Sequence, residues 1–184
     1  TNPFFYRIYG LLVSSDILLP VLNKQSILPP LKITRKPDVI ISKTNKKLKK
    51  DFSLDFKKAG FHKNGVGSFE IIKGKSIFYN KEKLCSDADF SLALLHIPFA
   101  KLFFQRRKFP LHAGAIQYNS EAVLFSGISG KGKSSLTATF LKQFKLISED
   151  ITVLSSSKNN KEAIPSFPFI KLKEEKTLPK KNLH

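Results

Sequence analysis

The chain contains no methionine and no tryptophan, and it has one cysteine in 184 residues. Because position 1 is not Met, we expect the chain to be a fragment, a processed form or a trimmed piece of a longer protein. The single thiol, Cys85, cannot form an internal disulfide, which favours a reducing compartment. No base partner is evident beside Cys85, so we expect a buried or incidental thiol and not a nucleophile.

A long hydrophobic run is also missing. The longest apolar stretch, residues 90–104, is too short for a membrane span and contains His96, Pro98 and Lys101. No signal peptide is recognisable, so the sequence predicts a cytoplasmic protein that does not enter a membrane. Hydrophobic residues make up 41% of the chain and 17 residues are Phe, which is enough for a core. The length fits one domain, or one domain with a small annex.

Acidic residues are scarce, with 14 Asp and Glu against 32 Lys and Arg and a net charge of +18. Such an excess attracts anionic partners such as nucleotides, nucleic acid or acidic lipid. Only four of the basic residues are Arg, although base recognition and forked phosphate contacts favour Arg. We therefore interpret the lysines as a solvated surface, and a basic nucleic-acid-binding module stays open as an alternative.

Residues 1–85 predict a small, strand-rich N-terminal lobe. The apolar segment 4–13 is typical of one buried strand, and residues 39–41 predict a short strand. Residues 69–73 and 76–79 predict a β-hairpin around Gly74. The Lys-rich run 43–51 predicts an exposed loop. We find no repeat and no catalytic constellation in this part.

Residues 86–184 predict a second unit, which begins with a helix. Ser86 offers the helix start, and acidic residues follow it in the first turn, where the helix dipole favours them. Pro98 is expected to kink or split the helix. His96 fits a packed core or boundary residue better than a ligand. The basic cluster 105–108 matches a positively charged helix end, and a phosphate contact remains open.

The centre of this unit is the segment 122–135. Residues 122–125 predict a buried strand, joined by a turn at 119–120 to a preceding strand, 111–116, that carries His112. Residues 127–134 then match the phosphate-loop pattern of Gly, four residues, Gly-Lys-Ser. Beyond the loop, Leu136, Phe140, Leu141 and Phe144 recur at helical spacing and predict the apolar face of a helix.

The residue types in this loop suit a phosphate. Glycines let backbone N–H groups converge on phosphate oxygens, and the following helix adds its positive end. Lys133 can reach the β- and γ-phosphates, and the Ser134 hydroxyl can bind magnesium. A simple Gly-Ser turn is the alternative. The expected nucleotide-binding residues are Gly127, Ser129, Gly130, Lys131, Gly132, Lys133, Ser134 and Ser135.

Two adjacent carboxylates follow the next predicted strand, residues 145–148. A nucleotide site with Mg²⁺ needs a carboxylate near the phosphates. Glu149 and Asp150 stand where the end of a strand can face the loop. A solvated acidic turn is the alternative, but the scarcity of acidic residues argues for a functional pair.

The segment 111–154 resembles the catalytic core of HPr kinase/phosphorylase and its related serine kinases, including lasso-peptide kinases. The resemblance covers most of the chain, is specific at the core and is weak before residue 65. It implies an α/β fold of mixed α+β character, with a phosphoenolpyruvate-carboxykinase-like P-loop core after the strand-rich lobe. The matching segments are 9–16, 19–20, 67–69, 92–107, 111–113, 123–134, 146–150 and 164–172.

The resemblance implies an ATP-dependent kinase with Mg²⁺ that phosphorylates a serine on a small protein or peptide, in a possible homo-oligomer. It implies metal ligation by Ser134 and Asp150. Glu149 departs from the two aspartates usual in the family, which leaves the division of roles within the pair open. Relatives also continue beyond this chain's end, so a nucleotide-binding relative without turnover is the second reading. The implied catalytic residues are Asp150, Glu149, Lys133 and His112.

Overall fold

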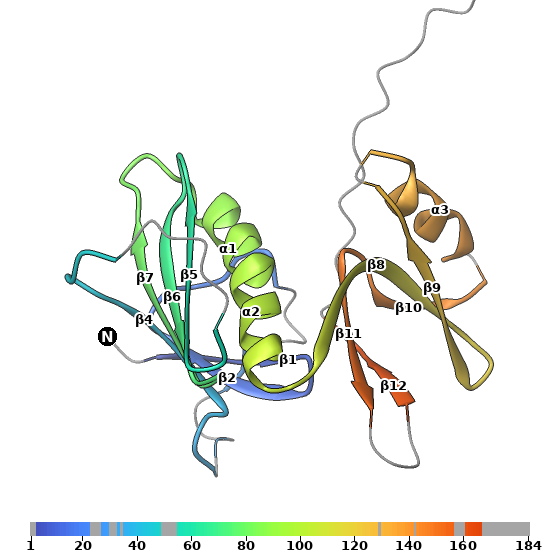
Figure 1. Ribbon diagram of the computed structural model, residues 1–184, viewed down its shortest axis with the longest axis horizontal. Helices are drawn as coiled ribbons and strands as arrows, with labels where there is room; N and C mark the ends of the chain where they lie inside the picture. Colours follow the sequence, from blue (N-terminus) through green and yellow to red (C-terminus); the bar gives the residue numbers. More distant parts are fainter. Residues whose placement is uncertain are drawn as a thin grey trace, which may run out of the picture.

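The computed structural model describes residues 3–22, 27–29, 33, 35–48, 55–128, 130–141, 143–156 and 161–166. Within these ranges the chain is a mixed α and β protein with two β-sheets and three helices (Figure 1). None of these helices has both the length and the apolar character needed to cross a bilayer.

The first sheet has seven strands in the order β3-β1-β2-β4-β7-β6-β5. Strands β2 and β4 and strands β4 and β7 pair in parallel, and the other neighbours are antiparallel. Its strands are β1 (Phe4–Ile8), β2 (Leu11–Ser15), β3 (Ile27–Leu28), β4 (Val39–Lys43), β5 (Lys58–Lys63), β6 (Gly67–Ile72) and β7 (Ser76–Lys81).

The prediction of a single strand over residues 4–13 is wrong. The chain reverses at Tyr9 and Gly10, which have φ of 52° and 71°, and β1 then pairs antiparallel with β2. Such torsions favour glycine and make a tight turn that hydropathy alone does not reveal. The predicted strand at 39–41 and the hairpin around Gly74 are confirmed as β4 and as β6 with β7.

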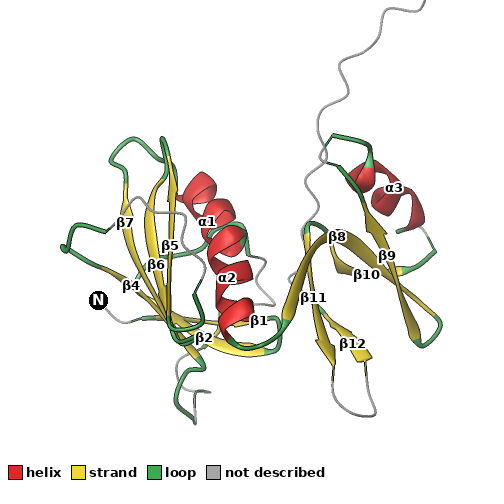
Figure 2. Cartoon of the chain, in the orientation of Figure 1, coloured by secondary structure: helices red, strands yellow, loops and turns green. Residues whose placement is uncertain are grey.

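Helices α1 (Asp87–Leu95) and α2 (Ile97–Gln105) lie on the first sheet, on the side that faces the second (Figure 2). Ser86 caps α1 by accepting a hydrogen bond from the Asp89 N–H at 3.0 Å, which confirms the predicted start. The predicted split near Pro98 is also confirmed. The Phe90 ring centroid lies 5.3 Å from that of Phe69, so α1 shares a core with the first sheet. The predicted division at residue 85 stays a prediction.

The end of α2 is fastened to the first sheet by polar side chains. The Gly74 N–H donates to Gln105 Oε1 at 2.7 Å, and Gln105 Nε2 donates to the carbonyls of Asp55 and Ile71 at 3.0 and 3.1 Å. Arg106 donates to the Gly74 carbonyl at 2.6 Å. Part of the basic cluster predicted to close the helix therefore contacts backbone carbonyls of the first sheet.

The second sheet has five antiparallel strands, in the order β10-β8-β11-β12 with β9 beside β8. Strand β8 arches, so that its first half pairs with β11 and its second half with β9 and β10 (Figure 1). The predicted hairpin through Asn119 is confirmed. The strands are β8 (Phe109–Tyr118), β9 (Glu121–Ser126), β10 (Lys145–Ser148), β11 (Ile151–Ser156) and β12 (Lys161–Ile164).

Two predictions about burial around the loop are wrong. No residue of β9 is buried, and Val123 is 38% exposed. Helix α3 (Lys133–Phe140) ends before two residues of its predicted apolar face, and Leu136 on that face is 46% exposed. The buried residue of α3 is Thr137, because Gly114 of β8 has no side chain and lets the helix approach closely.

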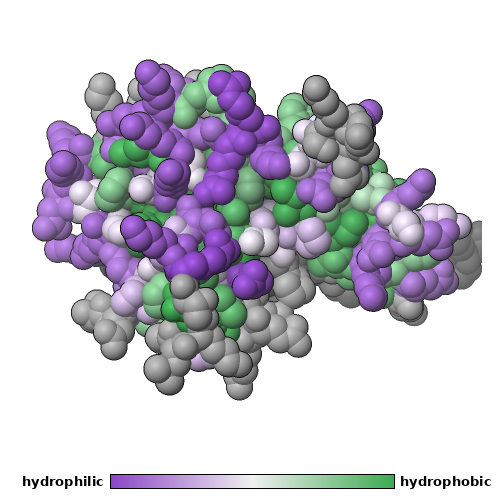
Figure 3. All heavy atoms as spheres, turned by 90° about the horizontal axis from the view of Figure 1, so that it is seen from below, coloured by the Kyte–Doolittle hydropathy of each residue, from purple (hydrophilic) through white to green (hydrophobic). Residues whose placement is uncertain are grey.

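The hydropathy of the surface differs between the part of the molecule that holds the first sheet and the part that holds the second (Figure 3). In the view of Figure 3, hydrophilic residues dominate the part that holds the first sheet, and hydrophobic residues gather where the two parts meet. Cys85 is buried, as predicted.

Candidate functional site

The glycine-rich loop lies at the surface between β9 and α3. Gly127, Gly130 and Gly132 have positive φ of 158°, 85° and 82°, and the last of these caps α3. Values of φ near 80° belong to the left-handed region, which residues with a Cβ adopt only with strain. Ile128 is 76% exposed. The loop is therefore open to a ligand. Ser129, another expected nucleotide-binding residue, lies outside the described residues.

Lys133 begins α3 and folds back over the loop. Its Nζ donates to the carbonyls of Gly127 at 2.8 Å and Ile128 at 3.2 Å. Ser134 and Ser135 follow in the first turn, half-buried and exposed respectively. An ammonium thus lies against the beginning of the loop, beside the positive end of a helix. A phosphate on this loop would compete with the two carbonyls for that ammonium.

Asp150 lies in the bend between β10 and β11, and each of its carboxylate oxygens meets an imidazole. His112 Nδ1 lies 2.8 Å from Oδ1 and 3.1 Å from the Asp150 carbonyl oxygen. His96 Nε2 contacts Oδ2. Burial raises the pKa of Asp150, but the His96 hydrogen bond and the charges of His96, His112 and Lys133 outweigh it and leave the pKa below its ordinary value. The carboxylate is therefore ionised at neutral pH.

The second sheet holds these groups in place. Ile151 pairs with His112 between β11 and β8, which brings the bend at Asp150 beside the histidine. Thr152 Oγ1 donates to the Ala113 carbonyl at 2.8 Å and is itself hydrogen-bonded to Ser148. Both hydroxyls are buried, so the strands that flank the bend cannot slide without losing these bonds.

The structure brings two of the expected catalytic residues, His112 and Asp150, into contact. Lys133 adds a charge that helps to lower the pKa of that carboxyl, after the larger contributions of His96 and His112. Glu149 stands beside Asp150 in the same bend, and its carbonyl oxygen lies near Gly114.

Two residues at the site were not predicted from the sequence. His96 is half-buried, which fits the boundary position expected for it, but its contact with Asp150 was not predicted. Tyr9 donates from its hydroxyl to the Ile151 carbonyl at 3.3 Å, and burial together with the charge of Asp150 raises its pKa. A polar residue at a helix break before Pro98 was a usable signal for His96. Nothing in the local sequence marks Tyr9.

The described residues hold no cluster of three or more His, Cys, Asp or Glu that could bind a metal ion. The two expected magnesium ligands are the hydroxyl of Ser134 and the carboxylate of Asp150. Each carboxylate oxygen of Asp150 already contacts a histidine, His96 or His112. Mg²⁺ in phosphoryl-transfer sites commonly takes one or two carboxylates, substrate phosphates and waters. A magnesium ion that arrives with a nucleotide would have to share an oxygen of Asp150 with an imidazole.

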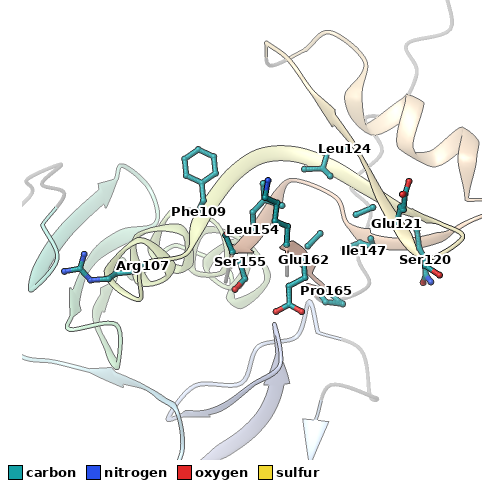
Figure 4. A pocket seen from close by; sticks show the side chains of 15 residues that line it. Arg107, Phe109, Ser120, Glu121, Leu124, Ile147, Leu154, Ser155, Glu162 and Pro165 are labelled. Carbon is teal, nitrogen blue, oxygen red and sulfur yellow. The ribbon is translucent and has the colours of Figure 1, made fainter. Parts of the chain in front are cut away.

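A separate groove of about 780 Å³ lies in the second sheet (Figure 4). Leu124, Ile147 and Leu154 line it, together with Phe109, which is 63% exposed. Because neighbouring residues of a strand point to opposite faces, Gln117 in this groove lies on the other face of β8 from Gly114 and α3. None of the expected site residues lines the groove.

Comparisons of the sequence with protein-family models and with curated proteins found no match, and a comparison with solved structures found none either.

Proposed function

We propose that the chain is an ATP-dependent serine kinase of the HPr kinase-related type, with a P-loop core in residues 86–184, that acts on a small protein or peptide in the cytoplasm. One observation carries the proposal: Gly114 lies beside both Thr137 of α3 and the Glu149 carbonyl, so the helix that begins at Lys133 and the bend that holds Asp150 lie against the same stretch of β8. Phosphoryl transfer needs a cation on the phosphates and a carboxylate that accepts the proton of the attacking hydroxyl.

The residues present fit ATP. Gly130 and Gly132, in the left-handed region, put no side chain between the loop backbone and a ligand, and the N-terminal end of α3 favours an anion. Lys133 already donates two hydrogen bonds to carbonyl oxygens, so it can donate to phosphate oxygens instead. Bound ATP with Mg²⁺ would supply the phosphoryl group and neutralise its charge. Ser134 and Asp150 are the residues that would hold the metal.

The acceptor hydroxyl is proposed to give its proton to Asp150. The low pKa keeps this carboxylate ionised before a substrate arrives, and His112 holds one of its oxygens. Glu149 remains the partner carboxylate in the bend. A hydroxyl placed between Asp150 and the loop would thus meet both a proton acceptor and a phosphoryl group.

The first experiment measures the melting temperature with and without ATP and Mg²⁺. At a nucleotide concentration of about 100 times Kd, binding should stabilise the chain by about 2.7 kcal/mol, or about 5–11 °C. Lys133→Ala should abolish the shift. Lys145→Ala, which removes the same charge from an exposed position on β10, should keep it. An equal shift in Lys133→Ala and the unaltered chain would exclude the loop as the nucleotide site.

The second experiment follows label from γ-labelled ATP into small proteins and serine-containing peptides. Asp150→Asn should lower transfer by about 10²- to 10⁴-fold and keep the ATP-dependent shift in melting temperature. Binding of ATP without transfer to any acceptor would support the nucleotide-binding relative without turnover. Tight, steeply salt-dependent DNA binding with no effect of ATP would favour the nucleic-acid module instead.

A further inference from the structure

His96 occupies the break between α1 and α2. Its backbone, at φ −87° and ψ −106°, is not helical, and it caps the end of one helix and the start of the next. Pro98 stands in the first turn of α2, where its missing N–H removes no helical hydrogen bond. The break turns His96 out of the packed face: its side chain is 44% exposed, whereas Leu95 is 1% and Phe99 is 0% exposed.

The imidazole of His96 reaches across to the second sheet. Its Nε2 contacts Oδ2 of Asp150, while His112 Nδ1 lies 2.8 Å from Oδ1. The two rings come from different elements, the α1–α2 junction and β8. A carboxylate with a partner on only one oxygen can still rotate about its Cβ–Cγ bond, because that torsion is broad. Partners on both oxygens remove this freedom.

Residues from the first sheet and from α2 also hold the bend that carries Asp150. The Tyr9 hydroxyl donates to the carbonyl of Ile151, the residue after Asp150, at 3.3 Å. Tyr9 in turn packs on α2, with its ring centroid 4.9 Å from that of Phe103. Lys133 at the start of α3 also contributes a favourable charge at Asp150, and Glu149 is the neighbour of Asp150 in the bend. The bend that carries Asp150 is therefore held by both sheets and by the helices between them.

We propose that His96 is a positioning residue, which fixes the rotation of the Asp150 carboxylate so that one oxygen faces the acceptor hydroxyl. This role rests on the proposed kinase function. His96 acts through Asp150, and among the described residues no hydrogen bond or ion pair joins its side chain to the glycine-rich loop. Its loss should lower kcat by about 10- to 100-fold, as misplacement of a reacting group does. The KM for ATP should stay within about twofold, since Lys133 is unchanged.

The test compares His96→Leu with His96→Gln in the full chain. Glutamine carries an amide N–H₂ that can donate to Asp150 from near the position of Nε2, and leucine has no donor. We expect kcat to fall in His96→Leu and to recover largely in His96→Gln, with unchanged KM for ATP. His62→Leu is the control, because His62 on β5 bonds Ser68 and Asn64 and should leave kcat unchanged. Melting curves check that each variant is folded.

Two results would overturn the positioning role. One is a folded His96→Leu chain with the kcat of the unaltered protein, and the other is a rise in KM for ATP without a fall in kcat. Failure of the proposed function looks different, because the unaltered chain then transfers no phosphoryl group. The contact between His96 and Asp150 is detected by ¹⁵N NMR of the imidazoles. Asp150→Asn should shift the signals of His96 and His112 but not of His62. An unmoved His96 signal also overturns the proposal.

Discussion

Gly114 lies in β8 beneath α3, and we expect its replacement by alanine to push the helix away from the sheet. A Cβ at this position would lie 2.3 Å from Thr137 Oγ1 and 3.3 Å from the Glu149 carbonyl oxygen. Thr137 has no room to retreat, because it is 0% exposed and its Oγ1 donates to the Lys133 carbonyl at 2.9 Å. The helix, the strand or both must therefore move.

The expected loss of stability in Gly114→Ala follows from this overlap. Forcing a methyl group into a packed site costs about 1–3 kcal/mol. In a chain of this length each kcal/mol lowers the melting temperature by about 2–4 °C. Because α3 begins at Lys133, its displacement should also reduce the stabilisation by ATP. Urea unfolding and thermal melting, each with and without ATP, measure both effects.

Thr137→Ala provides a matched rescue. Without Oγ1, the nearest atom of residue 137 to the new methyl group is its Cβ at 3.4 Å, an ordinary contact. The double variant should therefore be more stable than Gly114→Ala alone, with a coupling of about 0.5–3 kcal/mol. If Gly114→Ala unfolds at the same urea concentration as the unaltered chain, or Thr137→Ala gives no rescue, α3 does not pack on β8 as closely as described.

Two further predictions concern the first sheet. Gln105→Leu should lower the free energy of unfolding by about 2–3 kcal/mol in urea titrations, because buried backbone groups at the end of α2 lose their partner. Burial raises the pKa of Asp38, but Arg35, the Leu12 N–H and the charge of Arg106 outweigh it and lower the pKa. Asp38 thus adds stability at neutral pH that is lost as pH falls through this lowered pKa, and Asp38→Asn should unfold with a smaller acid dependence. Equal acid dependence in urea titrations from pH 7 to pH 3 would contradict this reasoning.

Features that depend on a few adjacent residues could be predicted from the sequence. The Ser86 cap, the helix split near Pro98 and the hairpin around Gly74 each follow from one residue type at one position. The glycine-rich loop and the carboxylate at 150 belong to the same class, because residue type and spacing alone suggested them.

Features that depend on distant partners could not be predicted. Residues 4–13 are apolar or aromatic apart from Arg7 and Gly10, and only their pairing shows a hairpin instead of one strand. The apolar spacing after the loop suggested a buried Leu136, whereas the neighbouring Thr137 is buried because Gly114 on another strand leaves space for it. Hydropathy reports how apolar a residue is, but its burial depends on which surface packs against it.

By itself, the sequence determined the groups on which the proposed function depends: a glycine loop, a lysine at a helix start and a carboxylate after the next strand. Only the tertiary structure decided which groups surround that carboxylate. Tyr9 and Ile151 are 142 positions apart, and His96 and Asp150 lie on different sides of the two-sheet interface. Contacts of this kind arise from the packing of sheets and helices, for which no short pattern of residues exists.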